Sequence, residues 1–329
     1  LDTYPEIDVF SYTELNHNPE KIVYIIECLR DGLDLQSIMK LVNNNRLNSE
    51  QLRYLRLLMN RGADVEPFID FSARQLEIIY RLYSIYGDDI IAVVRKRKDF
   101  YKQHTETLQM LVYIDFYGLA EPEKLIQNMQ KKGKPLNNNL LQETFLQLAE
   151  KKIKRIARKE IRNSEHPVTL HRILENPLSV DALYRLLDIH RSGGCIVPFL
   201  LLYDKDEKLF DTAYQWFEKT GLEPSDYVAG SLITGKLTVK TLEEQFVDYL
   251  EKQLGVKGLY YNTDTLIVLY NAHRKGINLL PYAQFDISSY QLNKIAEHIE
   301  KNKPVPPPET IKNNITPFFN ETLELYAEY

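Results

Sequence analysis

Hydrophobic residues recur at helical spacing ahead of a series of glycines along this chain. When the segments are aligned on glycine, the positions ten, seven and four residues before it are apolar in five of them. These positions are Ile22, Ile25 and Cys28; Leu52, Leu55 and Leu58; Leu108, Leu111 and Ile114; Leu183, Leu186 and Ile189; and Leu266, Leu269 and Ala272. Intervals of three and four residues place side chains on one face of a helix. The pattern therefore predicts an amphipathic helix before each glycine.

The residues that flank these apolar stripes predict where each helix begins and ends. A capping residue followed closely by an acid stands before several stripes, as is typical of a helix N-terminus. The expected caps are Asn18, Ser49, Thr105 and Thr263. The glycine is expected to end the helix in the left-handed conformation, which glycine adopts without steric cost. A second, shorter helix should follow, capped by Asp34, Asp64 or Asp89.

The glycine turns recur at a nearly constant interval. They fall at Gly32, Gly62, Gly87, Gly118, Gly193, Gly221 and Gly276, which are separated by 30, 25, 31, 75, 28 and 55 residues. The two long intervals correspond to two or three units of the same length. Before Gly87 the first stripe position is Glu77, so Leu76 is expected to take its place. A helix pair of this size cannot bury its stripe alone, and neighbouring pairs must stack. The sequence predicts an all-α fold, specifically an α-solenoid of long-helix/short-helix units.

The regularity of the pattern divides the chain into four segments. Residues 1–134 are expected to hold N-terminal helical repeats, and residues 179–303 C-terminal ones. Between them, residues 135–178 should form a long basic helix and a connector, with no clear glycine-closed unit from 119 to 178. The proline-rich KPVPPPE, at 303–309, is expected to be extended, and residues 304–329 comprise most of it and a C-terminal tail.

The repeated unit resembles a known class of tandem repeat. The likeness rests on the GLD or GAD turn and on the QL or TL helix start, over residues 14–118 and more loosely over 179–300. Similar repeats of about thirty residues occur in proteins of Gram-positive bacterial plasmids, conjugative elements and phages. The resemblance implies a mobile-element or phage context and an interaction role, and it supplies no catalytic residue.

The composition is that of an ordinary globular protein. Of 329 residues, 44% are hydrophobic and 26% charged, with a formal net charge of -5, which argues against wholesale disorder. The longest apolar run, at 195–203, falls far short of the roughly 20 residues of a membrane helix, so no membrane span is expected. Two cysteines, Cys28 and Cys195, are too few for a disulfide framework or a zinc cage. A reducing cytoplasm is the expected location.

Charge is distributed unevenly along the chain. Residues 91–162 contain sixteen basic and eight acidic side chains, a formal charge of +8 that leaves -13 for the remainder. Within KKIKRIARKEIR, the basic residues form a stripe opposite Ile153, Ile156, Ala157 and Ile161, as in an amphipathic basic helix. Candidate polyanion-binding residues are Arg95, Lys96, Arg97, Lys98, Lys131, Lys132, Lys151, Lys152, Arg155, Arg158, Lys159 and Arg162, with Lys134 beside them. Such a strip attracts phosphates through counterion release. Basic helix faces are often solvated or pair with acidic neighbours, so a charged face or an acidic protein partner is the favoured interpretation, and nucleic acid or another polyanion is the alternative.

Complete catalytic constellations do not emerge from the sequence. Gly230, Gly235 and Lys236 match part of a phosphate-binding loop, but Leu237 stands where the magnesium-binding hydroxyl belongs and Thr238 comes one place late. HPVTLH lacks the HExxH zinc arrangement, and Asp204, Asp206 and Glu207 lack EF-hand spacing and suggest a helix start. We therefore expect no catalytic residue, metal or cofactor, with nucleotide binding at Gly230–Lys236 as a minor alternative.

Two functional interpretations remain open at this point. The first is a non-enzymatic helical-repeat scaffold that binds another protein through its extended surface. The alternative is a nucleic-acid-binding accessory factor that uses the basic strip in residues 91–162.

Overall fold

In a computed structural model, residues 19–43, 46–161, 174–175, 177–228, 232, 235–257, 261–285 and 287–308 are described. These residues form α-helices joined by short turns, with one 3₁₀ turn and no β-strand among them. The expectation of an all-α fold is confirmed. The predicted cap Asn18, the candidate polyanion-binding residue Arg162 and the C-terminal tail lie outside the described residues.

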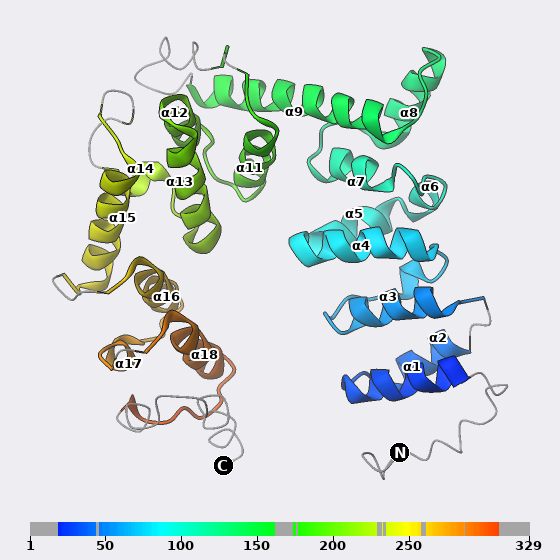
Figure 1. The fold of residues 1–329 in the computed structure, drawn as a ribbon, viewed down its shortest axis with the longest axis horizontal. Coiled ribbons are helices and arrows are strands. Elements are labelled where there is room, and N and C mark those ends of the chain that lie inside the picture. Colours follow the sequence, from blue (N-terminus) through cyan, green and yellow to red (C-terminus); the bar gives the residue numbers. More distant parts are fainter. Residues whose placement is uncertain are drawn as a thin grey trace. The chain divides into compact units, whose positions relative to one another are not determined.

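The helices belong to two compact units, residues 1–152 and 153–329. The first contains α1 (Pro19–Arg30), α2 (Leu35–Val42), α3 (Ser49–Met59), the 3₁₀ turn η2 (Glu66–Phe68), α4 (Ala73–Tyr86), α5 (Asp88–Lys96), α6 (Lys98–Lys102), α7 (Leu108–Phe116), α8 (Pro122–Lys131) and most of α9 (Asn138–Ile161). Its longer helices pack in chain order, α1 on α3, α3 on α4 and α4 on α7 (Figure 1). The shorter α2 packs on α1, and α5 packs on both α4 and α7.

The second unit is also built of helices that pack against one another. It contains α11 (Val180–Arg191), α12 (Val197–Lys205), α13 (Glu207–Thr220), α14 (Pro224–Tyr227), α15 (Val239–Leu254), α16 (Thr263–Arg274), α17 (Leu280–Ala283) and α18 (Ser289–Glu300). Helix α13 contacts α12, α15 and α16, and α16 contacts α18. The boundary between the units falls inside α9, within the segment 135–178 that the sequence set apart. Residues 303–307, in the proline-rich segment, adopt neither helix nor strand.

The apolar stripes form the core, as the spacing predicts. Every predicted stripe residue is buried except Ile22, which is half-buried. Leu76 is fully buried in α4 and replaces Glu77 in the stripe, also as expected. Glu77 instead binds Arg74 and Arg81 on the helix surface. Burying a leucine side chain contributes about 1.5–3 kcal/mol, so the stripes hold each helix against its neighbours.

The predicted glycines do end helices. All seven have a positive φ, between 57° and 86°. At most of them the residue after the glycine donates its amide to the carbonyl of the last stripe residue, as Ala63 does to Leu58 at 3.1 Å and Ile277 to Ala272 at 2.9 Å. This is the Schellman arrangement, which satisfies carbonyls left open at a helix end. At these turns, the buried residue four places before the glycine therefore also supplies the carbonyl that accepts the closing hydrogen bond.

Three further closures, at Gly133, Gly255 and Asn302, were missing from the sequence alignment. Helix α8 ends at Gly133, where Lys134 donates to Met129, so a glycine-closed helix does exist between 119 and 178. Helix α15 ends at Gly255, which has a φ of 68° and is followed by Val256 donating to Glu251 at 3.0 Å. Helix α18 ends at Asn302, which has a φ of 53° and is followed by Lys303 donating to His298. Asparagine tolerates the left-handed region better than most residues. An alignment on glycine alone could not detect this unit.

The predicted caps were mostly one residue late. Asn48 caps α3 in place of Ser49, and Asn262 caps α16 in place of Thr263. An asparagine oxygen reaches the third amide of its helix, and Asn48 also receives the reciprocal bond from Gln51. At α7, which starts at Leu108, the preceding Thr107 makes no side-chain cap, so the expected cap at Thr105 was wrong too.

The three aspartates expected to cap the short second helices fare differently. Asp34 caps α2, as expected, through the amide of Ser37. Asp64 accepts the amide of Glu66 at the start of the 3₁₀ turn. Asp89 lies in the first turn of α5 and is not its cap, because α5 follows Gly87 directly.

Two glutamine side chains link a long helix to the segment that precedes the next long helix. Gln51 closes the capping box of α3 and donates its amide to the carbonyl of Phe71, just before α4 begins. Gln75 does the same in α4, donating to the carbonyls of Tyr101 and Lys102. Gln75 is 98% buried, so these bonds satisfy groups that water cannot reach. The cap of one helix therefore also holds the chain that leads to the next long helix.

The loss of stability on substituting a closing glycine should depend on how well the new residue tolerates a positive φ. A methyl group on Gly62 would meet no atom within 4 Å, so Gly62→Ala tests the φ of +86° alone. Gly62→Ala should destabilise the protein by about 1–2 kcal/mol, and Gly62→Asn by less, because asparagine tolerates the left-handed region. Urea unfolding followed by circular dichroism measures both. Equal stability of wild type and Gly62→Ala would contradict the assigned backbone constraint.

Candidate functional site

Several of the predicted polyanion-binding residues already have partners within the fold. Arg97 donates from Nε to Asp115 at 2.9 Å and from one terminal nitrogen to both oxygens of Glu123 at 2.7 Å. Arg95 forms an exposed ion pair with Asp64 at 3.1 Å. Lys152 donates to the backbone carbonyl of Tyr117, where α7 ends. These cations stabilise contacts between helices and are not free to serve a ligand.

Four cations on one face of α9 have no such partner. Lys151, Arg155, Arg158 and Lys159 are exposed, and in the part of the chain that the structure describes their side chains make no hydrogen bond or ion pair. Opposite them, Ile153, Ala157 and Ile161 are buried and Ile156 is half-buried. Helix α9 thus has the expected amphipathic form, and its outer face carries uncompensated positive charge.

The remaining candidates are less informative. Lys96, Lys98, Lys131 and Lys132 are exposed. Lys131 and Lys132 lie before the first turn of α9, whereas Lys151 lies about 20 Å along that helix at 1.5 Å per residue. Arg162 lies outside the described residues. Arg97 and Lys152 thus have partners within the fold, whereas Lys151, Arg155, Arg158 and Lys159 have none among the described residues.

The segment that resembles a phosphate loop has a different local structure. Lys236 is exposed and lies before α15, which begins only at Val239. Thr238 is the N-cap of α15, and its hydroxyl accepts the amide of Thr241. The carbonyl of Gly235 accepts the ammonium of Lys205 at 2.7 Å. Gly230 is outside the described residues. Thr238 and Gly235 are thus occupied by structural bonds.

In the acidic cluster at residues 204–207, Asp206 and Glu207 mark a helix start, as expected, whereas Asp204 lies in the last turn of α12. Asp206 caps α13 by accepting the amide of Lys208 at 2.9 Å. Among the described residues, no three His, Cys, Asp or Glu side chains gather as metal ligands would, and no helix is long and apolar enough to cross a membrane.

Both cysteines are reduced and poorly nucleophilic. Burial raises the pKa of Cys28 to about 11. Burial, and then a hydrogen bond to Glu160, raise the pKa of Cys195 to about 12. Because the thiolate is the reactive form, neither thiol is activated at neutral pH. Cys195 instead serves as a donor to Glu160, at 3.1 Å.

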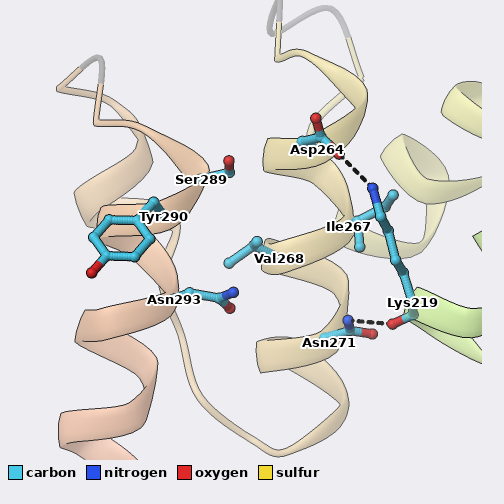
Figure 2. A pocket seen from close by; sticks show the side chains of 8 residues that line it. All are labelled: Lys219, Asp264, Ile267, Val268, Asn271, Ser289, Tyr290 and Asn293. Atoms are coloured by element: carbon cyan, nitrogen blue, oxygen red, sulfur yellow. Dashed lines mark hydrogen bonds and ion pairs between the residues drawn. The ribbon is translucent and has the colours of Figure 1, made fainter. Parts of the chain in front are cut away.

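A groove between consecutive long helices offers a different kind of surface. It is a pocket of about 480 Å³ formed by α16 and α18 with the end of α13. Figure 2 shows Ser289 and Asn293 on α18 pointing toward Val268 on α16, whereas the ring of Tyr290, also on α18, points away from α16. Lys219, from α13, binds Asp264 at 2.9 Å, and its backbone carbonyl accepts the amide of Asn271 at 2.8 Å.

The walls of this α16–α18 groove differ in how far their polar groups are engaged. On α18 the hydroxyls of Ser289 and Tyr290 and the amide of Asn293 make no hydrogen bond within the described residues. Tyr290 is 59% exposed, one of the most exposed large side chains described. On α16, Val268 points toward α18 and Ile267 lies beside Lys219, and both line the pocket although they are 9% and 4% exposed (Figure 2). The groove therefore combines apolar residues with free donors and acceptors.

Sequence reasoning missed the α16–α18 groove. Tyr290 and Asn293 lie twelve and nine residues before Asn302, and Asp264 and Ile267 lie at the same offsets before Gly276. The groove therefore joins equivalent positions of successive helices. Recognition of Asn302 as a closure would have aligned these positions, but a glycine pattern does not include it.

Comparisons with family models, with curated proteins and with solved structures find no match to this chain.

Arg97 should behave as a structural residue, because it is 20% exposed and pairs with a carboxylate that is 15% exposed. Arg97→Ala should cost about 2–3 kcal/mol, since it leaves Asp115 and Glu123 side by side without a cation. Arg97→Lys should restore only part of the loss, because lysine lacks the planar fork.

Arg95→Ala is the matched control for Arg97→Ala, because the Arg95–Asp64 pair is exposed and should contribute less than about 1 kcal/mol. Thermal and urea unfolding of the three variants measure the difference. Equal losses for Arg95→Ala and Arg97→Ala would contradict the structural role of Arg97.

Proposed function

We propose that this protein is an α-solenoid scaffold that binds an extended segment of a partner protein. The packing of α1, α3, α4 and α7 in chain order, and of α13, α16 and α18, supports a repeat architecture. Stacked repeats bind partners through surfaces shared by neighbouring units. In this proposal the protein acts by binding and not by catalysis.

The observation that carries the proposal is the groove between α16 and α18. An extended peptide presents amide donors and carbonyl acceptors along its backbone, and side chains that alternate in direction. Asn293 supplies both a donor and an acceptor, and Ser289 and Tyr290 supply hydroxyls. Ile267 and Val268 provide apolar surface for one partner side chain. The groove is thus chemically suited to an uncharged stretch of peptide.

Tyr290 is the expected anchor of this contact. Exposed tyrosine is enriched among the residues that dominate binding free energy, because it brings large apolar area with little loss of conformational entropy. Its ring lies 5.9 Å from the ammonium of Lys294, which helps to fix its position. A tyrosine at 59% exposure on a helix surface has much area left for a partner to bury.

The context of this scaffold is also a proposal. The resemblance of the repeated unit to those of Gram-positive mobile elements and phages supports a role in such a system. Two free cysteines are compatible with a cytoplasmic location.

A random linear peptide library displayed against the full chain tests the α16–α18 groove. Selected peptides should lose about tenfold or more in affinity on Tyr290→Ala, the loss typical of an interface anchor. Asn293→Ala should weaken binding less. Ile85→Ala, at another exposed apolar residue, is the control and should leave affinity unchanged. Failure to select any peptide, or selected peptides indifferent to Tyr290→Ala, would refute the groove as the binding site.

A second candidate function is nucleic-acid binding through α9. Its support is the absence of partners for Lys151, Arg155, Arg158 and Lys159 in the described part of the chain. Phosphate contacts by such cations release counterions and give salt-dependent affinity without sequence preference. With a net charge of -5, the chain as a whole repels nucleic acid, so binding would depend on this face.

Salt titration separates this candidate from the first. Binding of a DNA duplex should weaken steeply with salt, and changing the four α9 cations to glutamine should reduce the slope of log K against log salt by about three to four. A charge-matched variant supplies the control, with glutamine at the exposed Lys208, Lys252, Lys257 and Lys301. Salt-independent binding, or equal effects of both variants, would eliminate the nucleic-acid function.

A further inference from the structure

A second pocket, also of about 480 Å³, lies at the last turns of α9 and α11. Its described lining consists of Arg155, Ile156, Lys159 and Glu160 from α9 and His190 from α11. All five residues belong to the second compact unit. None of them takes part in the groove between α16 and α18. This α9–α11 pocket is therefore a separate feature that needs its own explanation.

Two of the lining residues carry uncompensated positive charge. Arg155 and Lys159 lie four residues apart, one helical turn, so their side chains share one face of α9. Both are exposed, and neither side chain has a hydrogen bond or ion pair within the described residues. Two neighbouring cations at one cavity repel each other, and a bound anion relieves that repulsion.

Glu160 contributes one negative charge to the lining, but among the described residues its carboxylate makes no ion pair with Arg155 or Lys159 and is bonded elsewhere. Its Oε2 accepts the backbone amides of Ile196 and Val197 and the thiol of Cys195, each at 3.1 Å. Ile196 is the N-cap of α12 and has no side-chain cap of its own, so Glu160 supplies the cap from another helix. The carboxylate is thus committed to the positive end of α12. The remaining lining is cationic, with His190 opposite.

We infer that the α9–α11 pocket binds a phosphomonoester, with the phosphate held by Arg155 and Lys159. The planar guanidinium of Arg155 matches phosphate oxygens bidentately, and the ammonium of Lys159 adds a point charge. Ile156 offers an apolar surface for the group that carries the phosphate. A volume of about 480 Å³ is that of a small-ligand site and exceeds the space needed by phosphate alone.

This inference does not depend on the scaffold proposal, and it differs from nucleic-acid binding by α9. Lys151 and Arg158 lie on the same helix, are equally exposed and carry the same charge, but they do not line the pocket. A polyanion that follows the helix face would use all four cations. A phosphomonoester in the pocket would use Arg155 and Lys159 alone.

Calorimetric titration of the full chain with phenyl phosphate tests the site, with ionic strength held constant by chloride. Arg155→Gln and Lys159→Gln should each weaken binding about tenfold, the usual effect of losing one charge-assisted hydrogen bond. Lys151→Gln and Arg158→Gln are matched controls and should change affinity less than about twofold. All four positions are exposed, so the variants should keep the wild-type melting temperature.

A phosphoserine peptide forms the second arm and distinguishes the source of the phosphate. Tighter binding of the peptide than of phenyl phosphate would support a phosphorylated partner, and the reverse would support a small metabolite. Absence of binding to both, equal losses in all four variants, or binding of phenol as tight as that of phenyl phosphate would overturn the inference.

Discussion

The closure of long helices at residues with a positive φ is the interaction on which this fold depends. At most of the glycine turns, the residue four places before the glycine is buried, and its carbonyl accepts the amide of the residue after the glycine. Leu58 and Ile114 show both roles, since each side chain is fully buried and each carbonyl receives the closing bond. Packing and chain reversal are thus coupled at one residue. A helix that extended past this point would carry the following segment away from the stripe that it has to cover.

As a consequence, several contacts that stabilise the fold join residues about 25 to 31 positions apart in the sequence. Arg56 pairs with Asp31, 25 residues earlier, and Gln75 bonds to a carbonyl 26 residues later. The hydroxyls of Tyr86 and Tyr117 lie 2.9 Å apart across 31 residues. These contacts tie each of the helices concerned to a segment that lies 25 to 31 residues away along the chain.

The buried residues of the core could be predicted from the sequence, whereas most of the caps and the partners of surface charges could not. Helical periodicity reports burial directly, which is why the stripe through Leu183, Leu186 and Ile189 was predicted correctly. Caps were misplaced because Asn48 and Ser49 are both good caps, and the choice between them depends on which oxygen reaches the third amide. Asn302 was missed because a rule based on glycine ignores other residues that adopt a positive φ. Arg97 looked like any other cation, since its partners Asp115 and Glu123 lie 18 and 26 residues away.

The contrast between Arg97 and Arg155 explains why charge in the sequence is a weak guide to a binding surface. Arg95, Arg97 and Lys102 each pair with an acidic residue that lies 18 to 32 residues away in the sequence. On the last turns of α9 the nearby acid is Glu160, and it is committed to the amides that begin α12. Arg155 and Lys159 therefore have no acidic partner among the described residues, and their positive charge remains on the surface of α9. Such charge is stabilised best by an anion from outside the chain, whatever molecule carries it.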